Sequence, residues 1–160
     1  MSNALKRVEE LLKFPDGLCR QCGLCCTCVS FKGGLNKGEI REMIENPETA
    51  EDQRAGAKDF LSIFEQYADN ATAKKAYPEV YRAIVENSKR PEVEVALFKC
   101  RFYNKDSGGC TNYETRPSLC RAYPVISEKN SYFPGCGYEE TGKQRWAEIE
   151  KILEELKKSS

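Results

Sequence analysis

The 160-residue sequence contains no histidine. This absence excludes the zinc sites that combine cysteine with histidine, and it excludes Rieske-type iron–sulfur centres, in which histidine binds one of the irons. It also removes the commonest general base, so neither a Cys–His nor a Ser–His catalytic pair can form. Any metal site or active site in this chain must therefore be built from other side chains.

The sequence also lacks an excess of charge and a long apolar run. Its 25 basic and 25 acidic residues balance, so no overall field favours nucleic acid or an anionic membrane. No apolar run approaches the length of a transmembrane helix, and charges interrupt residues 1–14, which lack the apolar core of a signal peptide. We expect a cytoplasmic protein without nucleic-acid or membrane partners, and the sequence identifies no protein partner.

Cysteine, in contrast, is abundant. Five of the nine cysteines lie between residues 19 and 28, and the other four follow far along the chain: Cys100, Cys110, Cys120 and Cys136. Cytoplasmic thiols are kept reduced, and an odd number of cysteines leaves one unpaired in a disulfide scaffold. Both facts favour metal ligation over disulfides.

The cysteine run places a thiol at every third residue, with Cys26 interrupting the rhythm: Cys19, Cys22, Cys25 and Cys28. A Cys-x-x-Cys step lets two thiolates reach one metal, and Gly23 allows close approach of the backbone. Three or more cysteines at this interval are typical of iron–sulfur runs, although Cys28 is not followed by the proline of such runs. The spacing therefore favours an iron–sulfur cluster, of the 4Fe–4S type, and thiolate ligands leave zinc as the alternative.

The adjacent residues Cys25 and Cys26 bear on the number of sites. Neighbouring side chains diverge by roughly 100° in a helix and point to opposite sides of an extended chain. We therefore hypothesise two nearby sites, each combining cysteines from the front and rear groups, with a single four-thiolate site as the alternative. Arg20, Arg101 and Arg121, each beside a cysteine, either offset the negative charge of such a centre or lie solvated at the surface.

Apolar residues at helical spacing predict several helices. We expect a helix at 3–13, one capped by Asn36 with Glu39 three residues later, one at 48–69, one starting at Pro78, and a closing helix at about 141–157. Residues 37–90 thus form a helical block without cysteine, to which we assign a scaffolding role. Alternation at Val93, Val95 and Leu97 predicts a strand that continues towards Cys100.

Turn signals surround the rear cysteines. We expect Cys100 and Cys110 to flank a hairpin-like loop, and residues 125–126 and 132–133 to bracket a second hairpin. Pro117 starts a helical turn that carries Cys120, and Arg116 before it pairs with a carboxylate or lies near thiolate charge. We therefore predict an α+β fold, mainly α-helical, in which a small cysteine-rich metal-binding core with short strands and hairpins packs against the block 37–90. Residues 1–160 are expected to form a single domain.

The order of these residues resembles the CxxCxxCC family of zinc- or iron-chelating proteins, the YkgJ-type cysteine-cluster proteins. The resemblance covers about residues 17–36 and 97–137 and is carried by Cys19-x-x-Cys22-Gly23-x-Cys25-Cys26, Cys100, Gly109-Cys110-x-x-Tyr113-x-x-Arg116-Pro117-x-x-Cys120-Arg121-x-Tyr123-Pro124 and Cys136. The metal ligands that it implies are Cys19, Cys22, Cys25, Cys26, Cys100, Cys110, Cys120 and Cys136. Cys28 departs from the family pattern and is a spare thiol, a buried apolar residue or a substitute ligand.

Three classes of function follow. The first is a metal-binding protein that holds an iron–sulfur cluster for electron transfer, redox or metal handling; the second is a zinc-binding structural or chelating protein without catalysis. The third is an enzyme accessory or methyltransferase-related protein, because segments resembling this one also occur in a flagellin lysine methylase. The chain shows no Gly-rich strand-to-helix loop for a nucleotide cofactor, which disfavours catalysis. Thiol–disulfide chemistry at Cys25 and Cys28 stays open.

Overall fold

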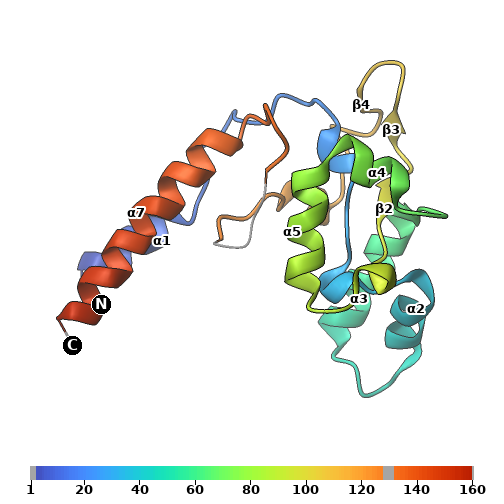
Figure 1. Cartoon of the computed structure of the whole chain (residues 1–160), viewed down its shortest axis with the longest axis horizontal. Helices are drawn as coiled ribbons and strands as arrows, with labels where there is room; N and C mark the ends of the chain where they lie inside the picture. Colours follow the sequence, from blue (N-terminus) through green and yellow to red (C-terminus); the bar gives the residue numbers. More distant parts are fainter. Residues whose placement is uncertain (1–2, 128–131, 160) are drawn as a thin grey trace. The chain divides into compact units, whose positions relative to one another are not determined.

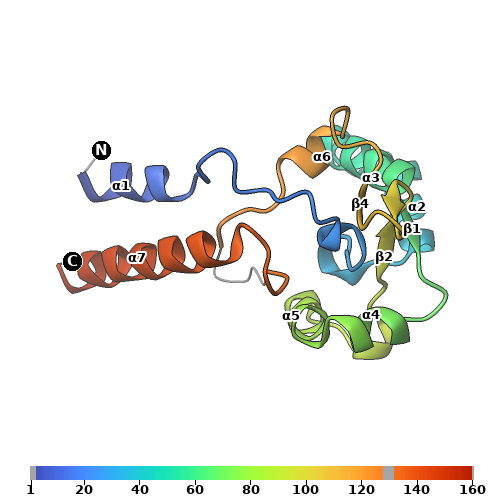
Figure 2. The same ribbon diagram turned by 90° about the horizontal axis from the view of Figure 1, so that it is seen from above.

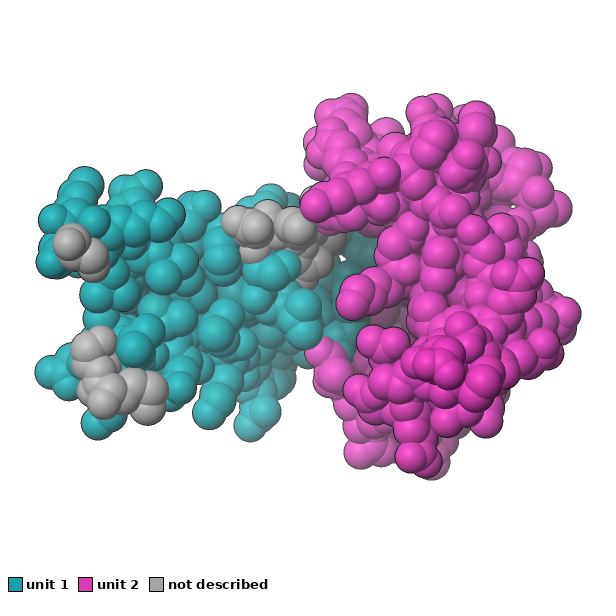
Figure 3. Space-filling view, turned by 90° about the horizontal axis from the view of Figure 1, so that it is seen from below, with its two compact units in different colours: residues 1–20, 123–160 teal, residues 21–122 magenta. Residues whose placement is uncertain are grey.

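The structure is a computed structural model that describes residues 3–127 and 132–159 (Figure 1). Within these residues the chain forms seven α-helices and two small antiparallel sheets of two strands each. The predicted mainly α-helical α+β fold is confirmed. The chain divides into two compact units, unit 1 (residues 1–20 and 123–160) and unit 2 (residues 21–122), coloured separately in Figure 3. The single-domain organisation stays a prediction.

Unit 1 is built on α1 (Asn3–Leu11) and α7 (Glu139–Lys158), which lie side by side (Figure 2). Their apolar faces bury Leu11 and Ile149 together with Ile126, and Arg7 on α1 pairs with Glu148 on α7 at 2.9 Å. Both helices were predicted, and their observed ends lie within two residues of the predicted ones.

Four helices of unit 2 form the block expected at residues 37–90: α2 (Lys37–Glu45), α3 (Glu51–Ile63), α4 (Ala71–Ala76) and α5 (Pro78–Ser88). The predicted capping box starts α2, because Asn36 accepts a hydrogen bond from the Glu39 amide at 3.0 Å and Glu39 accepts one from the Asn36 amide at 2.8 Å. Pro78 is the first residue of α5, as predicted.

The helix predicted over residues 48–69 is wrong at its C-terminal end. The helix α3 stops at Ile63, and β1 (Phe64–Gln66) pairs antiparallel with β2 (Phe98–Cys100). Phe64 also stacks against Phe60, with 4.7 Å between ring centroids. Pairing with a strand more than thirty residues away outweighs the local helical pattern of this segment.

The strand predicted from Val93 is shorter than expected. Residues 92–94 form a 3₁₀ turn, η3, in which Val93 is 93% exposed. Residues 95–98 are then all buried instead of alternating, because the chain has hydrogen-bonded neighbours on both sides: Tyr67 donates to the Leu97 carbonyl, and Phe98 bridges Val29. Val29, outside the named strands, forms an isolated antiparallel bridge with Phe98.

The core of unit 2 lies where α2 and α3 meet β2. Phe60 contacts the rings of Phe31 and Phe98, each with 5.0 Å between centroids, and Ile40 and Phe98 are fully buried. Each such large apolar side chain contributes about 1.5–3 kcal/mol on burial. Cys100 belongs to this core, and Cys26 and Cys120 pack against its edge, so the core directly supports the cysteines.

A hairpin joins Cys100 to Cys110, as predicted: β3 (Tyr103–Asn104) pairs with β4 (Gly109–Cys110). The helical turn after Pro117 is also confirmed as α6 (Ser118–Arg121). The turn of the second predicted hairpin, between residues 126 and 132, lies outside the described residues, and the described residues on either side of it are not in strands. In the described part of the chain, no helix combines the length and the apolar character of a membrane span.

Candidate metal centre

Three thiols of unit 2 meet at the edge of its core. Cys25 and Cys26 lie on a 3₁₀ turn, η1 (Leu24–Cys26), and Cys100 is the last residue of β2. The Cys26 side chain is hydrogen-bonded to both Cys25 and Cys100. We call these three residues the thiol trio. Whether Cys25 and Cys26 divide between two metal sites, as their adjacency suggested, stays a prediction.

The hydrogen bonds within the trio shift the pKa values of its thiols in opposite directions. The bond from Cys26 lowers the pKa of Cys100 to about 6, and the same bond raises the pKa of Cys26. The pKa of Cys25 is lowered, chiefly by its own hydrogen bond with Cys26. The hydrogen bond thus favours the thiolate form of Cys100 and the protonated form of Cys26. The thiolate is the form of cysteine that binds metal.

Cys120 lies close enough to Cys25, Cys100 and Cys110 for their charges to interact. Burial raises the pKa of Cys120 on α6 to about 11, and the charges of Cys100, Cys25 and Cys110 raise it further. Two backbone amides donate to sulfur at 3.4 Å, Phe102 to Cys100 and Asn112 to Cys110. Hydrogen bonds of this kind stabilise thiolates and tune a metal centre.

Cys22 lies where the cysteine run packs on the β3–β4 hairpin. Gly23, the next residue, has a φ of +71°, and a Cβ placed there would lie 2.8 Å from the Tyr103 ring and 2.9 Å from the Gly108 carbonyl oxygen. Only glycine meets both demands without strain. The close approach inferred for Gly23 is therefore made to the hairpin that carries Cys110.

Unit 1 brings the segments of Cys19 and Cys136 beside each other. A Cβ on Gly137 would collide with the Leu18 carbonyl, and Arg20 donates to the Gly135 carbonyl at 3.4 Å. Cys136 sits in a tight turn in which its amide donates to the Phe133 carbonyl at 2.9 Å. The role of Cys19 and Cys136 as metal ligands stays a prediction.

Cys28 has the surroundings of a core residue. Its side chain is buried, with 4% exposed, and this burial raises its pKa to about 11. At neutral pH it is therefore a neutral thiol, which packs like a small apolar side chain. Among the three roles left open for Cys28 by the sequence, the structure favours the buried apolar residue.

The donor set fits a soft or borderline metal by its chemistry. Thiolates suit zinc, iron–sulfur clusters and copper(I), and the trio draws its sulfurs from the cysteine run and from β2. Among the residues that the structure describes, no three cysteine, aspartate or glutamate side chains are arranged to hold a single ion. The trio is thus a gathered group of donors rather than a finished coordination shell.

The arginines next to cysteines bind backbone carbonyls. Arg101 donates to Leu61, and Arg121 donates to Arg116 at 2.9 Å and to Glu114 at 3.3 Å. The charge that acts on Cys25 and Cys120 belongs instead to Arg116.

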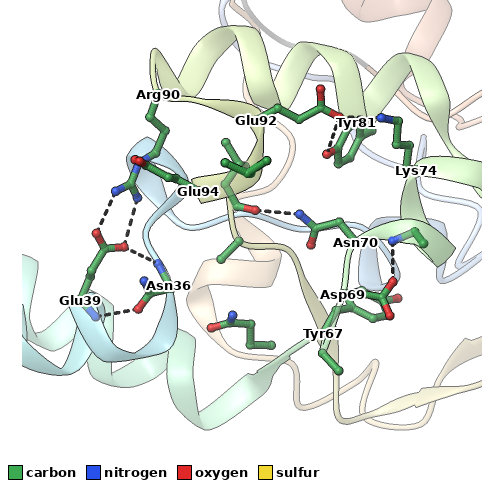
Figure 4. Close-up of a pocket in the computed structure, with 16 residues that line it drawn as sticks. Asn36, Glu39, Tyr67, Asp69, Asn70, Lys74, Tyr81, Arg90, Glu92 and Glu94 are labelled. Carbon is green, nitrogen blue, oxygen red and sulfur yellow. Dashed lines mark hydrogen bonds and ion pairs between the residues drawn. The ribbon is translucent and has the colours of Figure 1, made fainter.

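A concave surface of unit 2, of about 750 Å³, lies among α2, α4, α5 and η3 (Figure 4). Its charged side chains face one another: Glu39 pairs with Arg90 at 2.8 Å, and Lys74 pairs with Glu92 at 2.6 Å. Asn70 donates to the Val95 carbonyl at 2.7 Å. These bonds fasten the helices to the segment before β2, which gives this surface a structural role.

A histidine-free group of thiols beside a small helical core defines a cysteine-cluster metal-binding protein. The family model described as "Putative zinc- or iron-chelating domain", CxxCxxCC, matches residues 18–148. The chain belongs to the CxxCxxCC family, as its resemblance implied. No curated protein and no solved structure gives a significant match.

Proposed function

We propose that this protein binds an iron–sulfur cluster, of the 4Fe–4S type, and serves in electron transfer, redox chemistry or metal handling. The observation that carries the proposal is the thiol trio, in which Cys26 hydrogen-bonds to Cys25 and to Cys100 from a distant strand. The proposed ligands are the eight that the family resemblance implies: Cys22, Cys25, Cys26, Cys100, Cys110 and Cys120 in unit 2, and Cys19 and Cys136 in unit 1.

The cysteine spacing supports iron over zinc. Runs of cysteines at two-residue intervals are typical of cluster-binding segments, whereas zinc ribbons separate two such pairs. The amides of Phe102 and Asn112 already donate to two of the sulfurs, and hydrogen bonds to sulfur are one of the means by which proteins set a cluster's potential. When bound, the cluster would supply one-electron chemistry, and the chain would supply thiolates and hydrogen bonds.

Zinc is the second candidate. The family description names zinc beside iron, and four thiolates form a common structural zinc site. In that case the protein would be a structural or chelating module without redox chemistry.

Anaerobic purification separates the two candidates. We expect stoichiometric iron and sulfide by elemental analysis, together with a visible absorption band that bleaches on reduction with dithionite. A colourless protein with stoichiometric zinc would overturn the cluster in favour of zinc. A protein that retains neither metal after anaerobic reconstitution would overturn the metal-binding function itself.

A further inference from the structure

We propose that Tyr67 is a positioning residue for the metal centre: its hydroxyl holds the end of the cysteine run in place relative to β2 and so raises the affinity for the metal. The inference rests on the proposed function, because it concerns how the proposed ligands are held. Tyr67 is not itself a proposed ligand, and it lies outside the segments that carry the family resemblance.

Tyr67 is joined to β2 through its backbone. It follows β1 directly, and its amide donates to the Leu97 carbonyl at 2.9 Å. This bond extends the antiparallel pairing of β1 with β2, in which Phe64 lies opposite Cys100. The Lys99 ammonium on β2 also lies 5.7 Å from the centroid of the Tyr67 ring. The tyrosine is therefore fixed relative to the strand that ends at Cys100.

The side chain of Tyr67 reaches a segment 40 residues earlier in the chain. Its hydroxyl donates to the Thr27 carbonyl at 2.7 Å. Thr27 ends η1, the turn that carries Cys25 and Cys26, and its amide and hydroxyl both donate to the Leu24 carbonyl, at 3.0 and 2.7 Å. A continuous chain of hydrogen bonds thus leads from β2 through Tyr67 and Thr27 to η1.

The place of this bond in the cysteine run gives it a role in metal binding. Val29 and Phe98 also exchange backbone hydrogen bonds, of 3.1 and 2.8 Å, but this attachment lies two residues farther from η1 than Thr27 does. The bond to Thr27 holds the chain directly after Cys26. Only molecules whose ligands are already in place bind metal, so the apparent affinity falls when fewer molecules have that conformation. Loss of the hydroxyl should lower this fraction.

Tyr81 provides a matched control. Its hydroxyl donates to the Glu92 carboxylate at 3.0 Å, and the two residues lie on α5 and η3 rather than in a cysteine segment. A hydrogen bond to a charged group stabilises a fold at least as strongly as one to a carbonyl. Removal of the Tyr81 hydroxyl should therefore lower the stability of the fold at least as much as removal of the Tyr67 hydroxyl.

The test measures zinc affinity of the full-length, metal-free protein by competition with a chelator. Y67F is expected to weaken zinc binding about 3- to 10-fold, the effect of one hydrogen bond on an equilibrium, and Y81F is expected to bind like wild type. Hydrogen exchange of the metal-free proteins gives a second readout. The Cys26 and Thr27 amides, which close η1, should exchange faster in Y67F than in wild type and at the wild-type rate in Y81F.

T27V is a second variant, which removes the hydroxyl bond from Thr27 to the Leu24 carbonyl. It should weaken zinc binding by a similar factor, and it decides the question if Y67F does not fold, because wild-type affinity in T27V would then overturn the proposal. Wild-type affinity in Y67F, an equal loss in Y81F, or unchanged exchange at Cys26 and Thr27 would each overturn the role of Tyr67 while leaving the metal site intact. If wild type itself binds neither zinc nor iron, the proposed function fails first.

Discussion

At the residue scale, Cys26 and Cys28 show how two neighbouring thiols acquire opposite properties. Cys26 is hydrogen-bonded to two other sulfurs. The side chain of Cys28, in contrast, is only 4% exposed, and burial alone raises its pKa. The family pattern already separated them, because Cys28 departs from it. The structure adds the physical difference: Cys26 takes part in a network of thiols, whereas Cys28 is buried in an apolar core.

This difference predicts opposite effects of two serine substitutions. Cys26→Ser should remove the bound metal and leave the stability of the metal-free protein nearly unchanged. Cys28→Ser should retain the metal and lower the free energy of unfolding by about 1–3 kcal/mol, because it buries a hydroxyl in an apolar site. Metal analysis and denaturant unfolding of both metal-free variants provide the measurement. Loss of metal from Cys28→Ser with unchanged stability would make Cys28 a ligand.

Glu39 predicts a defined dependence of stability on pH. Its hydrogen bonds with Arg90 and with the Asn36 amide lower its pKa from 4.5 to about 2. Because the folded-state pKa lies below the unfolded one, the ionised carboxylate stabilises the fold above pH 4.5, and this contribution is lost as the pH falls from about 4.5 through 2.

Thermal melts of Glu39→Gln and wild type should therefore differ at pH 7 and converge only as the pH falls below about 2. At neutral pH we expect a loss of about 1 kcal/mol, the usual value of a helix cap. The matched control is Glu42→Gln, on the exposed side of the same helix. A difference between Glu39→Gln and wild type that persists undiminished at low pH would contradict this role of the carboxylate.

At the scale of elements, features that depend on residues close in sequence could be predicted, whereas those that depend on distant partners could not. The capping box of α2 and the turn between β3 and β4 lie within a few residues of sequence, so both could be predicted. The strand β1 could not be predicted, because its partner β2 lies more than thirty residues away. The same reason hid the contact between Cys26 and Cys100, although the family resemblance implied that both are ligands.

The packing of the cysteine run on the β3–β4 hairpin can be tested at Gly23. Gly23 and Gly33 both have positive φ, but a Cβ at Gly33 would meet no atom within 4 Å. Gly33→Ala should lower the free energy of unfolding by about 1 kcal/mol, because its left-handed backbone conformation disfavours any residue with a Cβ. Gly23→Ala should cost more, because its Cβ would also meet the Tyr103 ring, and it should reduce metal retention. Equal losses of stability, measured by denaturant unfolding, would show that the run does not pack tightly on the hairpin.

At the scale of the whole molecule, two kinds of stabilisation coexist. The helical block has an aromatic core around Phe60 and ion pairs such as Glu39–Arg90. The cysteine segments contain short strands and turns, and their thiols are the groups that a metal would hold. Bound structural zinc contributes on the order of 10 kcal/mol of apparent folding energy, which is comparable to the stability of a whole domain.

Removal of the metal should therefore loosen one part of the chain selectively. Hydrogen exchange should become faster in residues 17–36, 101–127 and 132–137, while α2, α3 and α5 keep their protection. The strand β2 should stay protected with the block, because Phe98 is fully buried in its core. An unchanged exchange pattern and an unchanged cooperative melt would contradict the coupling between metal and fold.

The central claim is that sulfur alone holds the metal, and X-ray absorption at the metal edge of the anaerobically purified protein tests it most directly. We predict a first shell of sulfur atoms at about 2.3 Å, the length of a metal–thiolate bond, with no nitrogen or oxygen ligand. Cys26→Ser should lose this signal, and Cys28→Ser should keep it. A first shell of oxygen atoms at about 2.0–2.2 Å, the distance of carboxylate ligation, would contradict the account.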